Sequence, residues 1–165
     1  MIQELKTELK TLYEDLTVSG EEASALISMA GEATRDRSEF LQDLYFKENS
    51  KIKVMETVYK SKAEGDSTME MINISAGYDM FVSDLHKKAE KAMKTHCRAV
   101  IILTGILKLP SPHAEILYFR YLKRIPADEI ERRLNMSRTT YFRYQERGII
   151  LLNEYIRKGK DDNSF

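Results

Sequence analysis

The sequence predicts an all-α protein with a helical N-terminal region, a long connecting helix and a C-terminal helix-turn-helix. Apolar residues recur at steps of three and four through most of the 165 residues, and no segment shows the alternation of a strand. All three prolines fall between residues 110 and 126, where they divide the last third of the chain into short helices.

The first 109 residues are predicted to form a coiled-coil-like region that serves oligomerisation or binds a partner. A first apolar seam comprises Ile2, Leu5, Leu9, Leu12 and Leu16, and its helix is expected to end at Gly20. A second helix with small residues is predicted over residues 21–34, and a third from a serine cap at Ser38. The polar segment 61–68 is the best candidate for a mobile loop.

A long helix is predicted between this loop and residue 109. Its segment 99–107 is apolar on nearly every side, which indicates burial within the fold. Its seam comprises Met71, Ile74, Tyr78, Phe81, Leu85, Ala92, Ala99, Ile102, Ile106 and Leu109. The two seams fit either an intramolecular core or a homodimeric coiled coil.

Residues 110–158 are predicted to form the helix-turn-helix domain, and residues 159–165 a disordered tail. Ser111 and Pro112 are the residue types expected at the start of a helix over 113–122, and Pro126 at the start of the next.

The turn that follows is predicted from three consecutive residues. Asn135 tolerates the left-handed conformation of a sharp turn, Met136 is an apolar plug, and Ser137 is a helix N-cap. A short helix, a tight turn and a capped second helix make the helix-turn-helix pattern.

The second helix, residues 138–153, is the expected recognition helix. At about 100° per residue, Tyr141, Tyr144, Gln145, Gly148 and Leu152 point inward. The outward residues are Thr139, Phe142, Arg143 and Glu146, flanked by Arg138, Thr140 and Arg147. Phe142 fits either a groove contact or the core. Ile150 lies on the same side as Arg143 and is apolar, so it needs cover from either the N-terminal helices or a second subunit. Together with the two apolar seams, this need for cover predicts a homodimer.

Charge is unevenly distributed in a chain of zero formal net charge. Residues 110–160 carry 11 Lys or Arg against 6 Asp or Glu, so the C-terminal third is basic and the remainder acidic. A basic excess favours a polyanionic partner such as double-stranded DNA, although a solvated surface would show the same numbers.

The stretch E-I-L-Y-F-R-Y-L-K-R-I-P-A-D-E-I-E-R-R-L-N-M-S-R-T-T-Y-F-R, Glu115 to Arg143, resembles the C-terminal helix-turn-helix of phage transcriptional regulators of the ArpU and RinA type. That module is similar to the fourth conserved region of bacterial sigma factors. The resemblance implies a sequence-specific DNA-binding transcription regulator, an activator of late phage genes. Such a protein would act in the cytoplasm of a bacterial or phage-infected cell, with RNA polymerase as a candidate partner.

Carried over to this sequence, the resemblance makes Arg138, Thr139, Thr140, Phe142 and Arg143 the base-facing candidates. Candidates for the DNA backbone are Ser137, Arg147, Lys123, Arg124, Arg132 and Arg133; the arginines and the lysine fit solvated charge equally well.

Other function classes find little support in the composition. No apolar run approaches the roughly 18 residues of a membrane helix, and the first residues lack a signal-peptide layout, so no membrane partner is expected. Cys97 is the single cysteine, the three histidines are not at zinc-ligand spacing with it, and no catalytic motif stands out. We therefore expect no metal, no cofactor and no enzyme. The alternative function is a sigma-like module that docks on RNA polymerase or another regulator without reading DNA.

Overall fold

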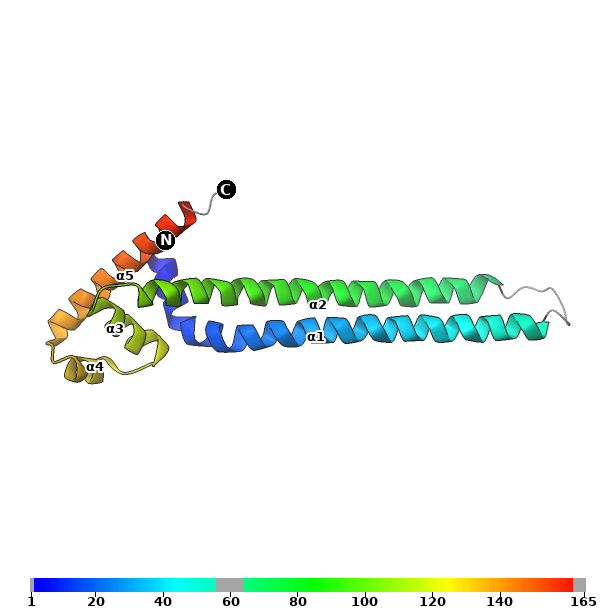
Figure 1. The fold of residues 1–165 in the computed structure, drawn as a ribbon, viewed down its shortest axis with the longest axis horizontal. Helices are drawn as coiled ribbons and strands as arrows, with labels where there is room; N and C mark the ends of the chain where they lie inside the picture. Colours follow the sequence, from blue (N-terminus) through cyan, green and yellow to red (C-terminus); the bar gives the residue numbers. More distant parts are fainter. Residues whose placement is uncertain (1, 56–63, 162–165) are drawn as a thin grey trace. The chain divides into compact units, whose positions relative to one another are not determined.

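The computed structural model describes residues 2–55 and 64–161, with side chains described for residues 2–43 and 72–159. Its elements are α1 (Ile2–Met55), α2 (Glu64–Leu107), α3 (His113–Leu117), the π-helical turn η1 (Tyr118–Leu122), α4 (Ala127–Arg133) and α5 (Arg138–Asp161) (Figure 1). No strand occurs within these two ranges, so the predicted all-α class is confirmed for them.

Contacts divide the chain into two compact units. One unit comprises residues 1–21 and 92–165, and the other comprises residues 22–91. The packing groups the first 21 residues with residues 92–165. The functional division predicted at residue 109 stays a prediction.

The first helix does not break where the sequence predicted a break. α1 continues through Gly20 and through Ser38, so the three helices expected over this region are one. A Cβ built at Gly20 would lie 3.0 Å from the ring of His96 in α2. This glycine therefore makes room for a close approach between two helices, a role that a sequence window cannot separate from helix termination.

Within residues 22–91, segments of α1 and α2 meet through small side chains. Among the described side chains of this unit, the buried apolar residues are Ala23, Ala30, Ala33, Leu85 and Ala89. Arg37 adds polar contacts, an ion pair of 2.7 Å with Asp79 and a hydrogen bond of 2.7 Å that it donates to Ser75. The small-residue pattern predicted for 21–34 therefore corresponds to a helix–helix contact.

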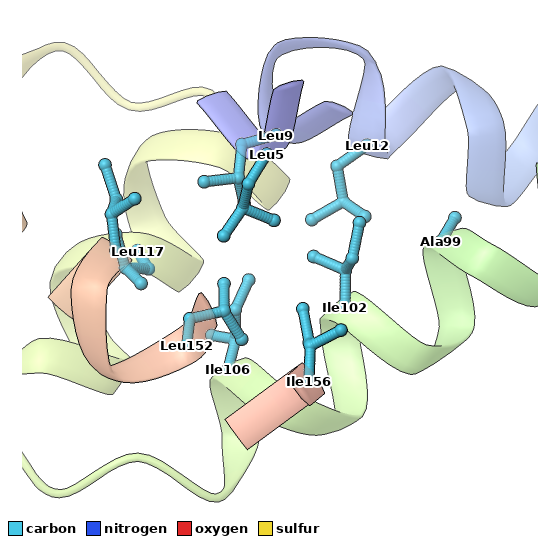
Figure 2. Packing of buried hydrophobic residues seen from close by; sticks show 10 residues of the cluster. Leu5, Leu9, Leu12, Ala99, Ile102, Ile106, Leu117, Leu152 and Ile156 are labelled. Carbon is cyan, nitrogen blue, oxygen red and sulfur yellow. The ribbon is translucent and has the colours of Figure 1, made fainter. Parts of the chain in front are cut away.

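The main core of the other unit joins four helices. Figure 2 shows leucines of α1 meeting α2 and α5 around one apolar centre. Its buried members are Leu5, Leu9, Leu12, Ala99, Ile102, Ile106, Leu117, Ile149, Leu152 and Ile156. Most of the first seam and the end of the second thus pack inside one chain, as the intramolecular interpretation predicted.

The end of α2 is less buried than its composition suggested. Ile102 and Ile106 are buried, but Val100, Ile101 and Leu107 are exposed, with Ile101 at 49%. The predicted burial of 99–107 is therefore wrong for one side of the helix. Hydrophobicity around a helix does not say how many neighbours it has.

Two predicted irregular segments are partly helical. Residues 64–68 of the expected loop 61–68 belong to α2, and residues 61–63 lie outside the described part of the chain. Likewise, α5 continues to Asp161, so residues 159–161 of the expected tail are helical, and residues 162–165 lie outside the described part.

The helix predicted over 113–122 is present as two consecutive pieces, α3 and η1. Ser111 does not cap it: its hydroxyl donates a hydrogen bond of 2.6 Å to the Glu115 carboxylate, and no side chain caps α3. Ile116 of α3, Ile130 of α4 and Tyr141 of α5 form a second, small buried cluster.

Candidate nucleic-acid interface

A four-residue connection links α4 to α5, and its geometry follows from the residues predicted there. Asn135 has a φ of 48°, the left-handed conformation expected of it. The backbone N–H of Met136 donates to the carbonyl of Glu131 at 3.0 Å. The Met136 side chain packs on the cluster of Ile116, Ile130 and Tyr141, so the predicted plug is confirmed.

The start of α5 is capped by Ser137, as predicted. Its Oγ accepts a hydrogen bond of 3.3 Å from the backbone N–H of Thr140. The two hydroxyls, Ser137 Oγ and Thr140 Oγ1, also lie within hydrogen-bonding distance of each other at 2.9 Å. Thr140 is half-buried, so its hydroxyl takes part in the cap as well as lying beside the exposed face.

The inward face of α5 packs closely on α3. Tyr141 is completely buried, and a Cβ at Gly148 would lie 3.3 Å from Leu117 Cδ1 and 3.4 Å from His113 Cβ. His113 Nδ1 lies 3.0 Å from the carbonyl oxygen of Tyr144. The prediction that Gly148 admits a neighbouring helix is therefore confirmed.

A second polar contact fixes α5 against η1. Gln145 donates a hydrogen bond of 3.1 Å from Nε2 to the hydroxyl of Tyr121. Burial raises the pKa of Tyr121, and the hydrogen bond from Gln145 lowers it by a smaller amount. α5 is thus held from its inner side by apolar packing and by this amide.

The outward face of α5 presents four of the five side chains predicted to read bases, and the fifth, Thr140, is half-buried. Arg138, Thr139, Phe142 and Arg143 are exposed, and Phe142 at 47% is not part of the core. The Arg138 guanidinium carbon lies 5.7 Å from the centre of the Phe142 ring. The corresponding distance from Arg143 to Tyr144 is 5.6 Å. Each contact restricts a long cationic side chain through a cation–π interaction.

The arginines of α4 differ from those of α5 in their partners. Arg132 lies 3.4 Å from Asp128, and Arg133 forms a hydrogen bond of 3.0 Å with Glu129, both pairs at a spacing of four residues. Their positive charges are therefore partly neutralised within their own helix. Among the described residues, no carboxylate forms an ion pair with the arginines of α5 that face outward, Arg138, Arg143 and Arg147.

Two further candidates for backbone contact lie in the connection after η1. The Lys123 ammonium is 5.8 Å from the Tyr118 ring centre. Arg124 has a φ of 55° and its guanidinium lies 2.7 Å from a carboxylate oxygen of Glu14 in α1. Neither this backbone conformation nor the partner was predicted, and no local sequence signal could identify a partner 110 residues away.

Clusters of metal-ligating side chains and membrane-spanning helices are both absent from the described residues. Within the described side chains, no three His, Cys, Asp or Glu residues come together as metal ligands would. Of the helices within residues 2–55 and 64–161, none is both long and apolar enough to span a bilayer.

Comparison of the chain with models of protein families, with curated proteins and with solved structures finds no match. The resemblance of residues 115–143 to phage regulators therefore rests on those residues alone.

Proposed function

We propose that this protein is a sequence-specific DNA-binding transcription regulator, in which α4 and α5 act as a helix-turn-helix and the first turns of α5 enter the major groove. The observation that carries the proposal is the contrast between the two helices. The arginines of α4 have carboxylate partners, whereas those on the outer face of α5 have none among the described residues. A capped helix that keeps unneutralised guanidinium groups outward is suited to a polyanion.

The outward residue types match base edges in the major groove. Arginine binds guanine O6 and N7 through two hydrogen bonds, and threonine or phenylalanine contacts the methyl group of thymine. We assign Arg138 and Arg143 as readers of guanine, with Thr139 and Phe142 beside them. Because Phe142 and Tyr144 hold these guanidinium groups, less side-chain entropy is lost when they bind.

The role in transcription rests on the resemblance of residues 115–143 to the phage regulators. Under this proposal, Ser137, Lys123 and Arg147 contact the phosphate backbone and set the register of α5. Activation of late genes would then require an additional contact with RNA polymerase.

The test compares two exposed arginines of α5. Arg143→Ala is expected to weaken binding to DNA selected from a random pool by about 1–3 kcal/mol and to relax the preference at one base pair. Arg157→Ala is the control, because residue 157 lies about 21 Å further along the same helix, at 1.5 Å per residue. The measurement is a gel shift at several salt concentrations.

Two results would contradict the proposal. Equal affinities of the Arg143→Ala and Arg157→Ala variants would mean that α5 does not enter the groove with its first turns. A wild-type protein that selects no sequence from the pool would favour the alternative, a helical module that docks on RNA polymerase or another regulator.

A further inference from the structure

Resting on the proposed function, we infer that Glu14 of α1 competes with DNA phosphate for Arg124, so that the first helix limits the affinity of the DNA-binding region. Arg124 lies between η1 and α4, just before the proposed helix-turn-helix. Its partner comes from the opposite end of the chain, within the same compact unit.

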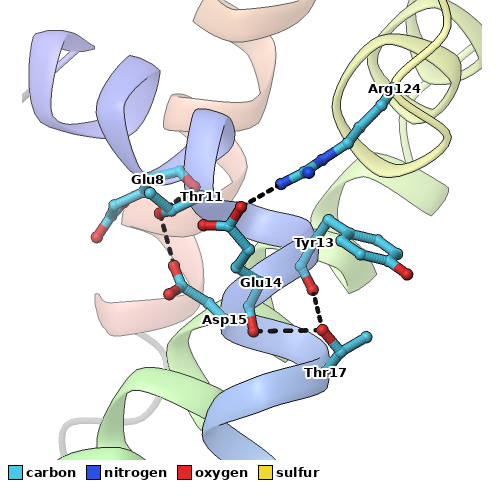
Figure 3. A network of polar contacts seen from close by, with 7 residues as sticks. All are labelled: Glu8, Thr11, Tyr13, Glu14, Asp15, Thr17 and Arg124. Carbon is cyan, nitrogen blue, oxygen red and sulfur yellow. Dashed lines mark hydrogen bonds and ion pairs between the residues drawn. The ribbon is translucent and has the colours of Figure 1, made fainter.

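The contact is specific in geometry. Arg124 Nη2 donates a hydrogen bond of 2.7 Å to Glu14 Oε1, and the guanidinium carbon lies 4.9 Å from the centre of the Tyr13 ring. Figure 3 shows the Arg124 side chain extending toward α1, with Glu14 and Tyr13 on either side of its end. With a φ of 55°, Arg124 adopts a backbone conformation that residues other than glycine seldom adopt.

The neighbouring acidic residues of α1 have other partners. Glu8 accepts two hydrogen bonds of 3.0 Å from Arg98, and Asp15 accepts one of 2.7 Å from Thr11. Of these three carboxylates, Glu14 is the one that pairs with the connection between η1 and α4.

Arg124 can exchange its carboxylate partner for a phosphate. The Arg124 and Glu14 side chains are 50% and 59% exposed, so the pair lies in water and contributes little to folding. A phosphate offers a guanidinium the same kind of charged oxygen acceptors as a carboxylate. Glu14 takes one of the N–H donors of Arg124 and offsets the positive charge that attracts a phosphate. Arg124 therefore binds phosphate more strongly once Glu14 is released.

Two measurable effects follow. Glu14→Gln is expected to raise affinity for the selected DNA roughly three- to tenfold at low salt, because Arg124 becomes available to one more phosphate. The slope of log affinity against log salt is expected to steepen by roughly 0.9, the value for one additional phosphate contact. Glu14→Ala, which leaves no acceptor, is expected to act in the same direction.

A double-substitution cycle separates this mechanism from a general charge effect. In an Arg124→Ala background, Glu14→Gln is expected to leave affinity and salt slope unchanged, since its action requires Arg124. Asp15→Asn, which removes an adjacent charge that does not face Arg124, is the control and is expected to change affinity less than twofold. Circular dichroism melting checks that each variant is folded.

The outcomes distinguish the inference from the function on which it rests. Wild-type binding that Glu14→Gln and Glu14→Ala leave unchanged would overturn the inference alone. The inference would also be overturned if Glu14→Gln raised DNA affinity as much in the Arg124→Ala background as in the wild type, or if Asp15→Asn raised it as much as Glu14→Gln. A wild type that binds no selected DNA would remove both the proposed function and the inference.

Discussion

At the scale of single residues, Tyr141 combines an aromatic ring that packs in an apolar cluster with a hydroxyl that is buried in the same place. Its ring is completely buried with Ile116 and Ile130, yet its hydroxyl has no hydrogen-bond partner in the described part of the protein. A buried hydroxyl without a partner loses the hydrogen bonds it made to water in the unfolded chain. Tyr121 differs, because its hydroxyl accepts a hydrogen bond from Gln145.

We therefore expect Tyr141→Phe to leave the free energy of unfolding unchanged or to raise it by up to about 1 kcal/mol. Tyr121→Phe is the matched control and is expected to lower it by about 1 kcal/mol, because the Gln145 amide loses its acceptor. Urea unfolding at pH 7 measures both. If Tyr141→Phe loses as much stability as Tyr121→Phe, the conclusion that the Tyr141 hydroxyl has no hydrogen-bond partner is contradicted.

The same residue predicts a dependence on pH. Burial raises the pKa of Tyr141 above its usual value near 10. The unfolded chain therefore releases the Tyr141 proton at a lower pH than the folded protein does. The free energy of unfolding is unaffected by this proton below about pH 10 and falls as pH rises toward the folded-state pKa. Tyr141→Phe is expected to lose less stability than the wild type between pH 8 and pH 11. If urea unfolding shows the same loss of stability in the variant and in the wild type, ionisation of Tyr141 does not contribute to the pH dependence.

At the scale of elements, α2 shows that an apolar helix can be covered on one side only. Ile101 and Ile102 are adjacent and identical in type, but Ile101 is 49% exposed and Ile102 is 1% exposed in the core with α1 and α5. The sequence indicates an apolar segment, and the number of neighbouring helices decides which residues are buried.

This pair permits a matched test of the packing. Ile102→Ala is expected to reduce the free energy of unfolding by about 2–4 kcal/mol through lost burial and a residual cavity. Ile101→Ala is expected to cost less than about 1 kcal/mol. Chemical denaturation at low and high protein concentration measures both. Equal costs would contradict the packing, and a cost at Ile101 that grows with protein concentration would support the predicted homodimer.

At the scale of the whole molecule, the two ends of the chain build one compact unit. Leu5, Leu9 and Leu12 pack in the same core as Leu117 and Leu152, so α1 covers an apolar side of α5. Ile150, whose need for cover contributed to the prediction of a homodimer, is half-buried and is not among the residues of this core. The homodimer stays a prediction.

Two deletions test this arrangement. Removal of residues 1–21 is expected to lower the melting temperature sharply, because the apolar residues of α5 lose their cover. Removal of residues 22–91, with residue 21 joined to residue 92 by a linker of about six glycine and serine residues, is expected to preserve cooperative melting and DNA binding. Circular dichroism and gel shift measure both. A chain without residues 1–21 that melts like the wild type would contradict the shared core.

Features that depend on a few consecutive residues could be predicted. The left-handed Asn135, the Ser137 cap and the helical stretch 113–122 were expected and are present, because turns and caps are formed by groups within about four residues of each other. The outward set on α5 was expected for the same reason, since a helical repeat assigns faces once the helix start is known.

Features that depend on partners far away in the chain could not be predicted from the sequence. Gly20 inside α1, the exposed side of α2 and the ion pair of Arg124 with Glu14 all depend on which segment packs beside another. A glycine can end a helix or admit a neighbour, and an arginine can bind phosphate or a carboxylate, with the same local sequence. Only the tertiary packing chooses between these roles, because the choice is made by a helix far away in the chain.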